Sequence, residues 1–427
     1  MKINIAIELL DKNLQGVDLS HPETGNPGIG GSEWLFLMLA RYLQMYYDRD
    51  YRITIFHYSD CLLPDGVRDI HINSESDLLG RLSESDEQII VHQITKSNFW
   101  YERIAKTEII DIPWAHCYIK YPEVMFINAC TNVKRVVFVG REEYDAYIDD
   151  DIIKKSTFIY NMLNVQAAHK VRQSDYSKTV TYLGSLVPAK AFHALAEIWP
   201  EVLRKVPDAK LQIMGTGKLY DREAKLGKFG IAQEDYENYF MQFLTDEKGN
   251  ILSSVKFLGL IGAEKEDYFM DTAVGVVNPL GKDETFCLSA VEMELCGVPI
   301  VTVGKYGLLD TISDGESGLL YRNKKEFIDN LVKLLEDKEL NMKMGTYAPN
   351  FVKSRFDAKR IIKEWDSLFK KVINGEEDKY MKPRGYYGND LKWVRSVIRV
   401  IRFKLGIRFL PSLNKTKYIA RKLLKKC

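Results

Sequence analysis

The sequence predicts an α/β protein with two Rossmann-like halves in tandem, followed by a basic helical extension. Short runs of β-branched and apolar residues recur along the chain, and segments with helical periodicity separate them. Alternating strands and helices imply parallel sheets covered on both faces. A polar stretch without apolar periodicity, residues 166–178, divides two such series. At 427 residues, the chain is long enough for two domains and an extension.

The expected elements of the first half are short strands and one helix with few charges. The helix is predicted at residues 32–46, after a first strand and a glycine-rich turn. Strands are predicted at residues 2–7, 52–57, 88–91, 109–112, 135–139 and 157–160. This half is the predicted N-terminal domain, residues 1–165.

The second half repeats the pattern after the polar stretch. Strands are predicted at residues 179–183, 210–214, 255–258, 274–277 and 299–303, with helices between them. The predicted domain limits are 166–355 for this half, 356–375 for a following helix and 376–427 for the extension. Ligands of such folds bind at the carboxyl ends of the strands.

Composition narrows the class of protein. Hydrophobic residues make up 46% of the chain, which is typical of a globular protein with real cores. Six scattered cysteines form no C-x-x-C pair, which favours reduced thiols in a cytoplasmic protein over a disulfide framework or a zinc site. The first eight residues are interrupted by charge too early for a signal peptide, and we find no apolar run long enough to span a membrane.

Charge is distributed unevenly along the chain. Residues 391–427 contain twelve Lys or Arg and no Asp or Glu, so the rest of the chain carries the difference between +1 and +12, which is −11. This balance argues against a nucleic-acid footprint over the whole protein, and no nucleic-acid partner is expected.

Two carboxylates, Glu284 and Glu292, bracket a mostly apolar segment that should begin a helix. A helix rises about 1.5 Å per residue and turns about 100°, so both acids can line one side of a cleft, roughly 12 Å apart. The amides of residues 285–288 would be the unpaired N–H groups of the helix start, which is a ready anion site. The alternative is a buried helix with two solvated acids.

Four stretches together resemble a known family. Residues 277–292, with the Glu-x7-Glu spacing, resemble the corresponding region of retaining GT-B glycosyltransferases of glycosyltransferase family 4, the glycosyl transferases group 1. Residues 182–190 are similar to the family's strand and loop with a diphosphate-binding lysine, and residues 207–217 to its next strand and glycine loop. Residues 314–320 match a turn that follows. The resemblance covers roughly residues 179–325, in the family's order.

The resemblance implies a GT-B fold, in which two Rossmann-like domains face a central cleft. Residues 1–165 would form the acceptor-side domain, and residues 166–355 the nucleotide-sugar donor domain. The same resemblance implies transfer of a sugar from a nucleotide diphosphate-sugar with retention of configuration, and neither a metal nor another cofactor. The acceptor would be a saccharide or lipid-linked saccharide, in surface polysaccharide or glycolipid synthesis.

The resemblance also implies roles for individual residues. Glu284 would orient the donor sugar, and Glu292 would bind the ribose hydroxyls. His116 would lie near the transferred sugar, and His92 is a weaker candidate on the acceptor side. Lys190 would stabilise the leaving diphosphate, as positive groups and helix amides do in a dry cleft. The remaining substrate-binding candidates line the glycine loops and the helix start: Gly30, Gly31, Gly184, Ser185, Gly215, Thr285, Phe286, Cys287 and Leu288.

Three positions depart from the family pattern. Ser185 stands where many members have an arginine, so more phosphate charge would fall on Lys190 and the helix amides. Ala191 and Cys287 each replace a common glycine, and the bulk of Cys287 could narrow the space beside the sugar.

Other classes stay open at this point. A glycosidase also uses paired acids, but it needs no phosphate cradle and places the acids about 5 to 10 Å apart across one bond. The triplet Asp149-Asp150-Asp151 imitates a metal-binding motif of the other glycosyltransferase fold, but we expect a solvated acidic turn. A sugar-nucleotide-binding subunit without turnover and a GT-B-fold epimerase are further alternatives.

The basic tail predicts an amphipathic helix within residues 391–410. A basic stripe and an apolar stripe typify a helix that lies on an anionic membrane surface, here on the cytoplasmic face. The alternative is that the apolar stripe packs on the protein body and the charges face water. The basic stripe consists of Lys392, Arg395, Arg399 and Arg402, and the apolar stripe of Val394, Val397, Ile398, Ile401 and Leu405.

Overall fold

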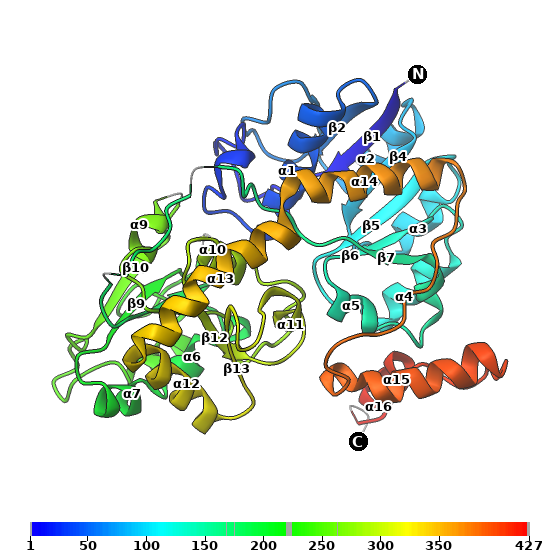
Figure 1. Cartoon of the computed structure of the whole chain (residues 1–427). Coiled ribbons are helices and arrows are strands. Elements are labelled where there is room, and N and C mark those ends of the chain that lie inside the picture. Colours follow the sequence, from blue (N-terminus) through cyan, green and yellow to red (C-terminus); the bar gives the residue numbers. More distant parts are fainter. Residues whose placement is uncertain (1, 168, 175, 219–223, 263, 425–427) are drawn as a thin grey trace. The chain divides into compact units, whose positions relative to one another are not determined.

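The computed structural model describes residues 2–167, 169–174, 176–218, 224–262 and 264–424. Contacts divide the chain into two compact units (Figure 1). The first unit comprises Met1–His21, Leu35–Asn161 and Lys359–Cys427, and the second comprises Pro22–Trp34 and Met162–Ala358. Both units are discontinuous in sequence, whereas the domain limits expected from the sequence are continuous segments.

The first unit is built on a seven-stranded sheet in the order β3-β2-β1-β4-β5-β6-β7, in which every pairing is parallel. Its central strands are apolar and buried on both faces, as the covering helices of a parallel sheet require. All six expected strands form. The bounds are β1 Ile3–Glu8, β2 Tyr51–His57, β3 Arg68–His71, β4 Ile89–Gln93, β5 Ile110–Ala115, β6 Val136–Phe138 and β7 Ser156–Phe158.

The helices of the first unit pack apolar side chains on this sheet. The predicted helix after the glycine turn is α1 Gly31–Tyr47, and the Ser74 side chain caps α2 by accepting a hydrogen bond from the Asp77 amide. The ring of Trp365, in α14, lies 4.8 Å from that of Trp114, at the end of β5. The other bounds are α2 Glu75–Ser83, α3 Asn98–Ile104, α4 Tyr121–Ala129, α5 Arg141–Asp145 and α14 Ala358–Ile373.

The second unit has a six-stranded parallel sheet in the order β10-β9-β8-β11-β12-β13. The strands are β8 Thr179–Leu183, β9 Lys210–Met214, β10 Val255–Gly259, β11 Val274–Val276, β12 Ile300–Val303 and β13 Gly318–Tyr321. The helices are α6 Phe192–Ala196, α7 Trp199–Lys205, α8 Glu234–Met241, α9 Lys265–Phe269, α10 Leu288–Leu295, α11 Leu308–Thr311, α12 Lys324–Glu336 and α13 Lys338–Phe356. A single apolar core joins both faces of this sheet. The two parallel α/β units are those of the expected GT-B fold.

Two strands were missed by the sequence analysis because both are short edge strands. β3 has three exposed or charged positions, and β13 follows directly on the turn at residues 314–317. Neither shows the long apolar run of a strand buried on both faces.

The polar stretch between the two series is held against the second unit. Arg172 is buried and donates to the carbonyl oxygens of Thr272 and Ala273, at 2.9 and 3.1 Å. It also donates to the Asn341 side chain at 2.7 Å. A stretch without apolar periodicity thus contributes a buried cation to the second unit.

The extension folds differently from the single helix expected at residues 391–410. It forms α15 Lys392–Arg399, a π-helical turn at Val400–Lys404, and α16 Leu413–Leu424. Gly406, at φ +75°, ends the first segment, because left-handed backbone suits glycine. In Figure 1 both helices lie beside the lower end of the first unit, where α16 contacts α4. The last three residues of the expected extension, 425–427, lie outside the described residues.

The expected solvated turn at Asp149-Asp150-Asp151 is wrong. Asp149 and Asp150 are buried, and the triplet binds basic and hydroxyl side chains of the extension. The interpretation of the extension as a helix with its apolar stripe on the protein is also wrong, because its basic stripe is the side that faces the protein. Sequence periodicity identifies two stripes on a helix, but not which of them is covered.

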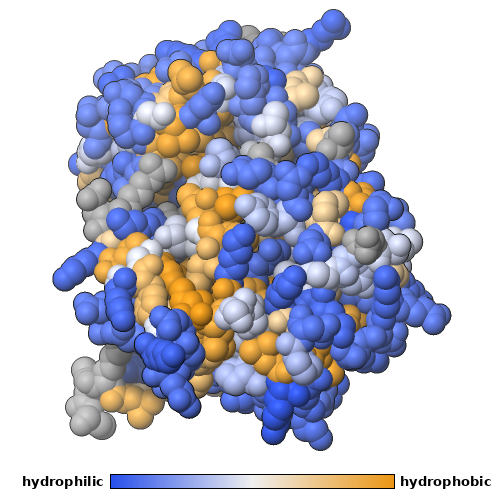
Figure 2. Space-filling view, turned by 90° about the vertical axis from the view of Figure 1, so that its left-hand side faces the viewer, coloured by the Kyte–Doolittle hydropathy of each residue, from blue (hydrophilic) through white to orange (hydrophobic). Residues whose placement is uncertain are grey.

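Surface and thiol features complete the fold. On the face drawn in Figure 2, hydrophobic side chains gather in clusters between hydrophilic ones. The five cysteines within the described ranges are free thiols. Within those same ranges, we find no helix that combines the length and the apolar character needed to cross a bilayer.

We predict that Arg172→Ala lowers the free energy of unfolding of the second unit by about 3 kcal/mol, because three buried acceptors lose a charged donor. Urea unfolding measures the change. The control is Arg204→Ala on α7, whose side chain is 74% exposed and should shift stability by less than ~0.5 kcal/mol. Equal effects of both substitutions would show that Arg172 does not hold the polar stretch.

Candidate donor site in the second unit

Two glycine loops meet at the carboxyl ends of β8 and β9. A Cβ added to Gly215 would lie 1.9 Å from the carbonyl oxygen of Gly184, so no other residue fits without moving the backbone. Gly184 donates to the Met214 carbonyl oxygen at 3.0 Å. Ser185, buried beside them, donates from Oγ to the Thr216 carbonyl oxygen at 3.1 Å. In this structure the Ser185 hydroxyl therefore serves the loop itself.

Lys190 ends a short 3-10 helix, Pro188–Lys190, that follows β8. Its carbonyl oxygen accepts a hydrogen bond from Tyr182 Oη at 2.9 Å, which ties the loop back to the buried strand. Ala191, next in sequence, has φ +55°. This left-handed conformation favours glycine, and here an alanine adopts it.

Glu284 lies in the loop after β11 and is almost fully buried. Its Oε2 accepts from Lys190 Nζ and from Asn278 Nδ2, both at 2.8 Å. The loop turns tightly because Asn278 and Asp283 both have positive φ. Glu284, Lys190 and Asn278 thus form one cluster at the carboxyl ends of β8 and β11.

The helix expected to start near residue 285 begins three residues later, at Leu288, and Cys287 is its N-cap. Thr285 and Phe286 therefore belong to the preceding loop. That loop is fixed by Gly307, whose amide donates to the Glu284 carbonyl oxygen at 2.9 Å. A Cβ on Gly307 would lie 2.1 Å from the Thr285 carbonyl oxygen, so this contact requires glycine.

The start of α10 keeps the electrostatics of a helix N-terminus. The Cys287 carbonyl oxygen accepts from the amides of Ala290 and Val291, so the first helical amides are those of Leu288 and Ser289. The Cys287 side chain does not cap them. Burial raises the pKa of the Cys287 thiol, so it stays protonated. The anion site expected from the sequence is thus shifted toward Leu288.

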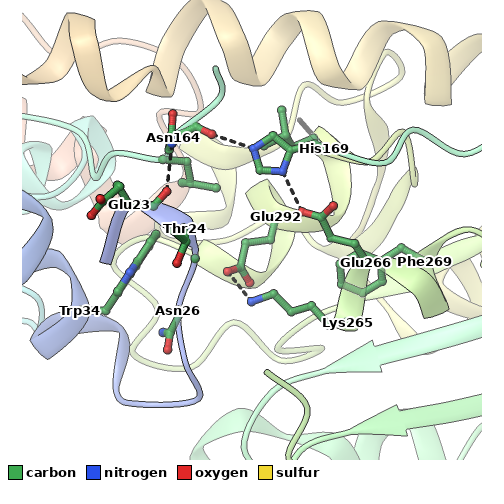
Figure 3. A pocket seen from close by; sticks show the side chains of 13 residues that line it. Glu23, Thr24, Asn26, Trp34, Asn164, His169, Lys265, Glu266, Phe269 and Glu292 are labelled. Carbon is green, nitrogen blue, oxygen red and sulfur yellow. Dashed lines mark hydrogen bonds and ion pairs between the residues drawn. The ribbon is translucent and has the colours of Figure 1, made fainter. Parts of the chain in front are cut away.

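Glu292, about one turn into α10, lines a pocket of the second unit (Figure 3). Its Oε1 accepts from Lys265 Nζ at 2.6 Å, and the two charged groups point toward each other in the pocket. Glu266, beside Lys265, accepts from His169 Nδ1 at 2.7 Å. The other lining residues are Glu23, Thr24, Gly25, Asn26, Trp34, Leu163, Asn164, Phe269 and Leu295.

The glycine turn of the N-terminal half also belongs to the second unit. A Cβ on Gly31 would lie 2.9 Å from Leu288 Cδ1, so this glycine packs closely against the start of α10. A Cβ on Gly30 would meet the carboxylate of Glu33 at 2.1 Å. Gly31 thus lies beside the start of α10, whereas Gly30 lies against the Glu33 side chain.

Sequence analysis missed Asn278 and Lys265, the partners of the two acids. Asn278 falls inside the stretch quoted for its resemblance and could have been noticed as a polar residue directly after a buried strand. Lys265 is one of several charges in the segment 264–267, and no pattern there distinguishes it. The pocket wall at residues 22–26 is likewise invisible in the sequence, since it comes from the other half of the chain.

The two histidine candidates lie in the first unit. His116 Nδ1 bonds to Gln93 Oε1 at 3.0 Å, and its ring packs on Phe36 and Trp114. Burial lowers the pKa of His116 to about 3, so the ring is neutral at physiological pH. His92 is fully buried, with its ring nitrogens bonded to Asp111 Oδ1 and the Gln93 carbonyl oxygen. His92 is therefore a structural residue and not an acceptor-side group.

One cluster of the first unit has metal-ligand chemistry. Ligand atoms of Asp11, His57 and Cys61 lie within 4.8 Å of one another. However, the Asp11 carboxylate already accepts from the amides of Tyr58 and Ser59, at 2.6 and 3.1 Å. Burial raises the pKa of the Cys61 thiol to about 12, so the sulfur keeps its proton and donates to Asp11. The Asp11 carboxylate and the Cys61 thiol are therefore engaged in a hydrogen-bonded network of the first unit.

Comparison with known proteins identifies the second unit. Residues 166–351 match the family described as glycosyl transferases group 1. The matched residues lie in the second unit and make up less than half of the chain.

Individual relatives are distant. The chain is 24% identical to an uncharacterised glycosyltransferase of Methanocaldococcus jannaschii, over 53% of this chain and 57% of that one. It is 26% identical to the poly(ribitol-phosphate) alpha-N-acetylglucosaminyltransferase of Staphylococcus aureus, over 58% and 46%. The chain thus spans about half the length of these curated relatives.

A solved structure covers more of the chain. Anabaena HepE in complex with UDP-glucose has a TM-score of 0.64 and 16% identity, over 86% of this chain and 100% of that one. At this identity the likeness shows the fold.

A buried acid on α10 predicts a pH-dependent stability. Burial raises the pKa of Glu294 well above its ordinary value; its Oε1 accepts from Ser317 Oγ at 2.5 Å, and its Oε2 has no hydrogen-bond partner in the described part of the chain. An acid with a raised folded pKa loses stability as pH rises above its unfolded pKa. Glu294→Gln removes that loss, while its amide oxygen can still accept from Ser317.

The free energy of unfolding of Glu294→Gln relative to the parent should therefore rise between about pH 5 and about pH 8, by up to ~1.4 kcal/mol per pH unit, as urea unfolding at each pH measures. Glu247→Gln, on an exposed turn, is the matched control. A difference between Glu294→Gln and parent that does not change with pH would contradict the raised pKa.

Proposed function

We propose that the protein is a retaining glycosyltransferase. It would move a sugar from a nucleotide diphosphate-sugar, without a metal ion, to a saccharide or lipid-linked saccharide. The observation that carries the proposal is the cluster of Lys190, Asn278 and Glu284 beside the start of α10. It lies within the part of the chain that matches the glycosyl transferases group 1.

Lys190 and the first amides of α10 would stabilise the leaving diphosphate. Developing negative charge is best stabilised by preorganised positive groups and helix N-termini in a site with little water. In the structure the Lys190 ammonium is neutralised by Glu284. A diphosphate carries more charge than one carboxylate, so it would compete for Lys190 and leave Glu284 to the sugar hydroxyls.

Glu284 would then orient the donor sugar while Asn278 holds its carboxylate in place. Glu292 would accept hydrogen bonds from the ribose hydroxyls, with Lys265 fixing one of its oxygens. The neutral ring of His116 would orient the sugar by hydrogen bonding and not by its charge.

The donor and acceptor are proposed from relatives. HepE is a structural neighbour crystallised with UDP-glucose, so a uridine diphosphate sugar is the first donor to test. The Staphylococcus aureus relative is named for transfer to poly(ribitol-phosphate), which supports an acceptor in surface polysaccharide or glycolipid synthesis. We further propose a peripheral position on the cytoplasmic face of a membrane, through residues 391–427.

We predict that Glu284→Gln lowers turnover by ~100-fold, because the charged acceptor that orients the sugar is lost. Nucleotide binding should stay within a few-fold of the parent, since glutamine can still accept from Lys190 and Asn278. Release of nucleoside diphosphate across a panel of donors measures turnover, and calorimetry measures binding. The matched variant Glu292→Gln should show the opposite pattern, with weaker nucleotide binding.

Two outcomes would contradict the proposal. Sugar transfer by Glu284→Gln at the parent rate would remove Glu284 from the donor site. Binding of nucleotide-sugars by the parent without release from any donor would favour a binding subunit. NMR of the product's anomeric configuration tests retention, and activity after treatment with a chelator tests metal independence.

A further inference from the structure

The extension at residues 391–424 turns its basic stripe toward the first unit. Lys392 Nζ lies 2.5 Å from Glu142 Oε1 and 3.1 Å from Asp145 Oδ2, and it is fully buried. Arg395 is 1% exposed and bonds Asp149 Oδ1 at 2.9 Å. Both cations are buried and paired with carboxylates of the protein, so they are not available to contact a membrane.

Asp149, Asp150 and Asp151 act as an acidic clasp for the extension. Asp149 accepts from the Leu413 amide at 2.6 Å, and Asp150 accepts from Ser412 Oγ at 2.6 Å. Asp151 pairs with Arg402 at 2.6 Å and with Arg408 at 3.1 Å. Because breaking a buried pair leaves an uncompensated charge, the clasp fixes which face of the helix looks outward.

The outward face of the extension is apolar. Trp393, Val397 and Val400 recur at four- and three-residue spacing, and Trp393 is 59% exposed. Leu405 and Phe409 continue this surface beyond the π-helical turn, and Phe409 is 90% exposed. Exposed apolar side chains grouped on one element mark an interaction surface, whereas single ones are normal.

The extension also carries exposed basic side chains. They are Lys404, next to Leu405 in sequence, and Lys415, Arg421 and Lys422 on α16. Residues 391–427 contain no Asp or Glu, so no acidic side chain of the extension opposes an anionic partner. A segment that combines exposed apolar anchors with cations is complementary to a bilayer surface with anionic headgroups.

We propose that the extension docks on an anionic bilayer through its apolar face. Trp393, Val397, Val400, Leu405 and Phe409 insert at the boundary between headgroups and acyl chains, and the exposed Lys and Arg of the extension contact lipid phosphates. The sequence alone favours the opposite orientation, in which the basic stripe of Lys392, Arg395, Arg399 and Arg402 faces the membrane. The inference rests on the proposed membrane location, and it is independent of the proposed sugar transfer.

Co-sedimentation of the full chain with vesicles tests the docking. The parent should bind vesicles of phosphatidylcholine mixed with phosphatidylglycerol, and bind phosphatidylcholine alone weakly. Trp393→Ser combined with Phe409→Ser should lower the bound-to-free ratio by ~10-fold or more, because two exposed anchors are lost. Lys404→Gln combined with Lys415→Gln should weaken binding to the mixed vesicles and reduce its dependence on salt.

The matched control is Leu62→Ser combined with Phe99→Ser, which removes two exposed apolar side chains elsewhere in the first unit. This variant should bind vesicles as the parent does. Thermal unfolding of each variant confirms that it is folded. Release of nucleoside diphosphate from free donor should be unchanged in the Trp393/Phe409 variant, so a failure of docking and a failure of sugar transfer are separate results.

Three results would overturn the docking proposal. The first is that the parent sediments with neither vesicle, and the second is that the Trp393/Phe409 variant sediments as the parent does. The apolar face could instead hold two copies together, in which case the parent would be a dimer in solution, the Trp393/Phe409 variant a monomer, and neither would bind vesicles.

Discussion

Every strand in both sheets runs parallel to its neighbours, and this constraint determines where the chemistry can lie. Parallel strands need crossover helices on both faces, so the sheet interior is apolar and closed. Polar side chains are left to the loops at the carboxyl edge, where successive strands deliver them to one place. In the second unit, β8 delivers the Lys190 loop and β11 delivers Asn278 and Glu284.

Close contacts between backbone segments shape the candidate donor site at that edge of the sheet. Gly184 and Gly215 nearly touch, and Gly307 lies against the Glu284–Thr285 peptide. These contacts leave no room for a Cβ and set the loop that ends at the N-cap of α10. The glycines therefore position the acid and the helix amides without contributing any charge themselves. The ion pair of Lys190 with Glu284 holds two opposite charges together at this edge, which costs less than burying either charge alone.

Buried charge also organises the first unit, with a different outcome. The clasp of Asp149, Asp150 and Asp151 takes up the cations of the extension, so the extension shows apolar side chains outward. An amphipathic segment has two ways to lie on a protein. In this protein the basic stripe faces the protein, where it pairs with buried carboxylates, and the apolar stripe faces outward. This arrangement is favoured because leaving a buried carboxylate unpaired costs more free energy than exposing an apolar side chain to water.

Much of the fold could be read from the chain. Eleven expected strands form, since an apolar run buried on both faces has few alternatives. The edge strands β3 and β13 carry no such run and were missed. In the candidate site, Glu284 and Lys190 form an ion pair, since both follow strands that end at the same edge of the sheet. Gly31 lies against Leu288. The helix start was placed three residues early, because apolar periodicity runs through the N-cap while backbone angles end the loop at Cys287.

By itself, then, the sequence determined the α/β class, the parallel strands and the residue types gathered at the carboxyl edge, since these follow from local periodicity and strand order. The tertiary structure alone decided which partners those residues have. It paired Glu292 with Lys265, brought residues 22–26 to the wall of its pocket, and buried Asp149 under Arg395. Pairing of charges over such sequence separations depends on burial and geometry, because the free energy of an ion pair is set by its surroundings and not by its position in the chain.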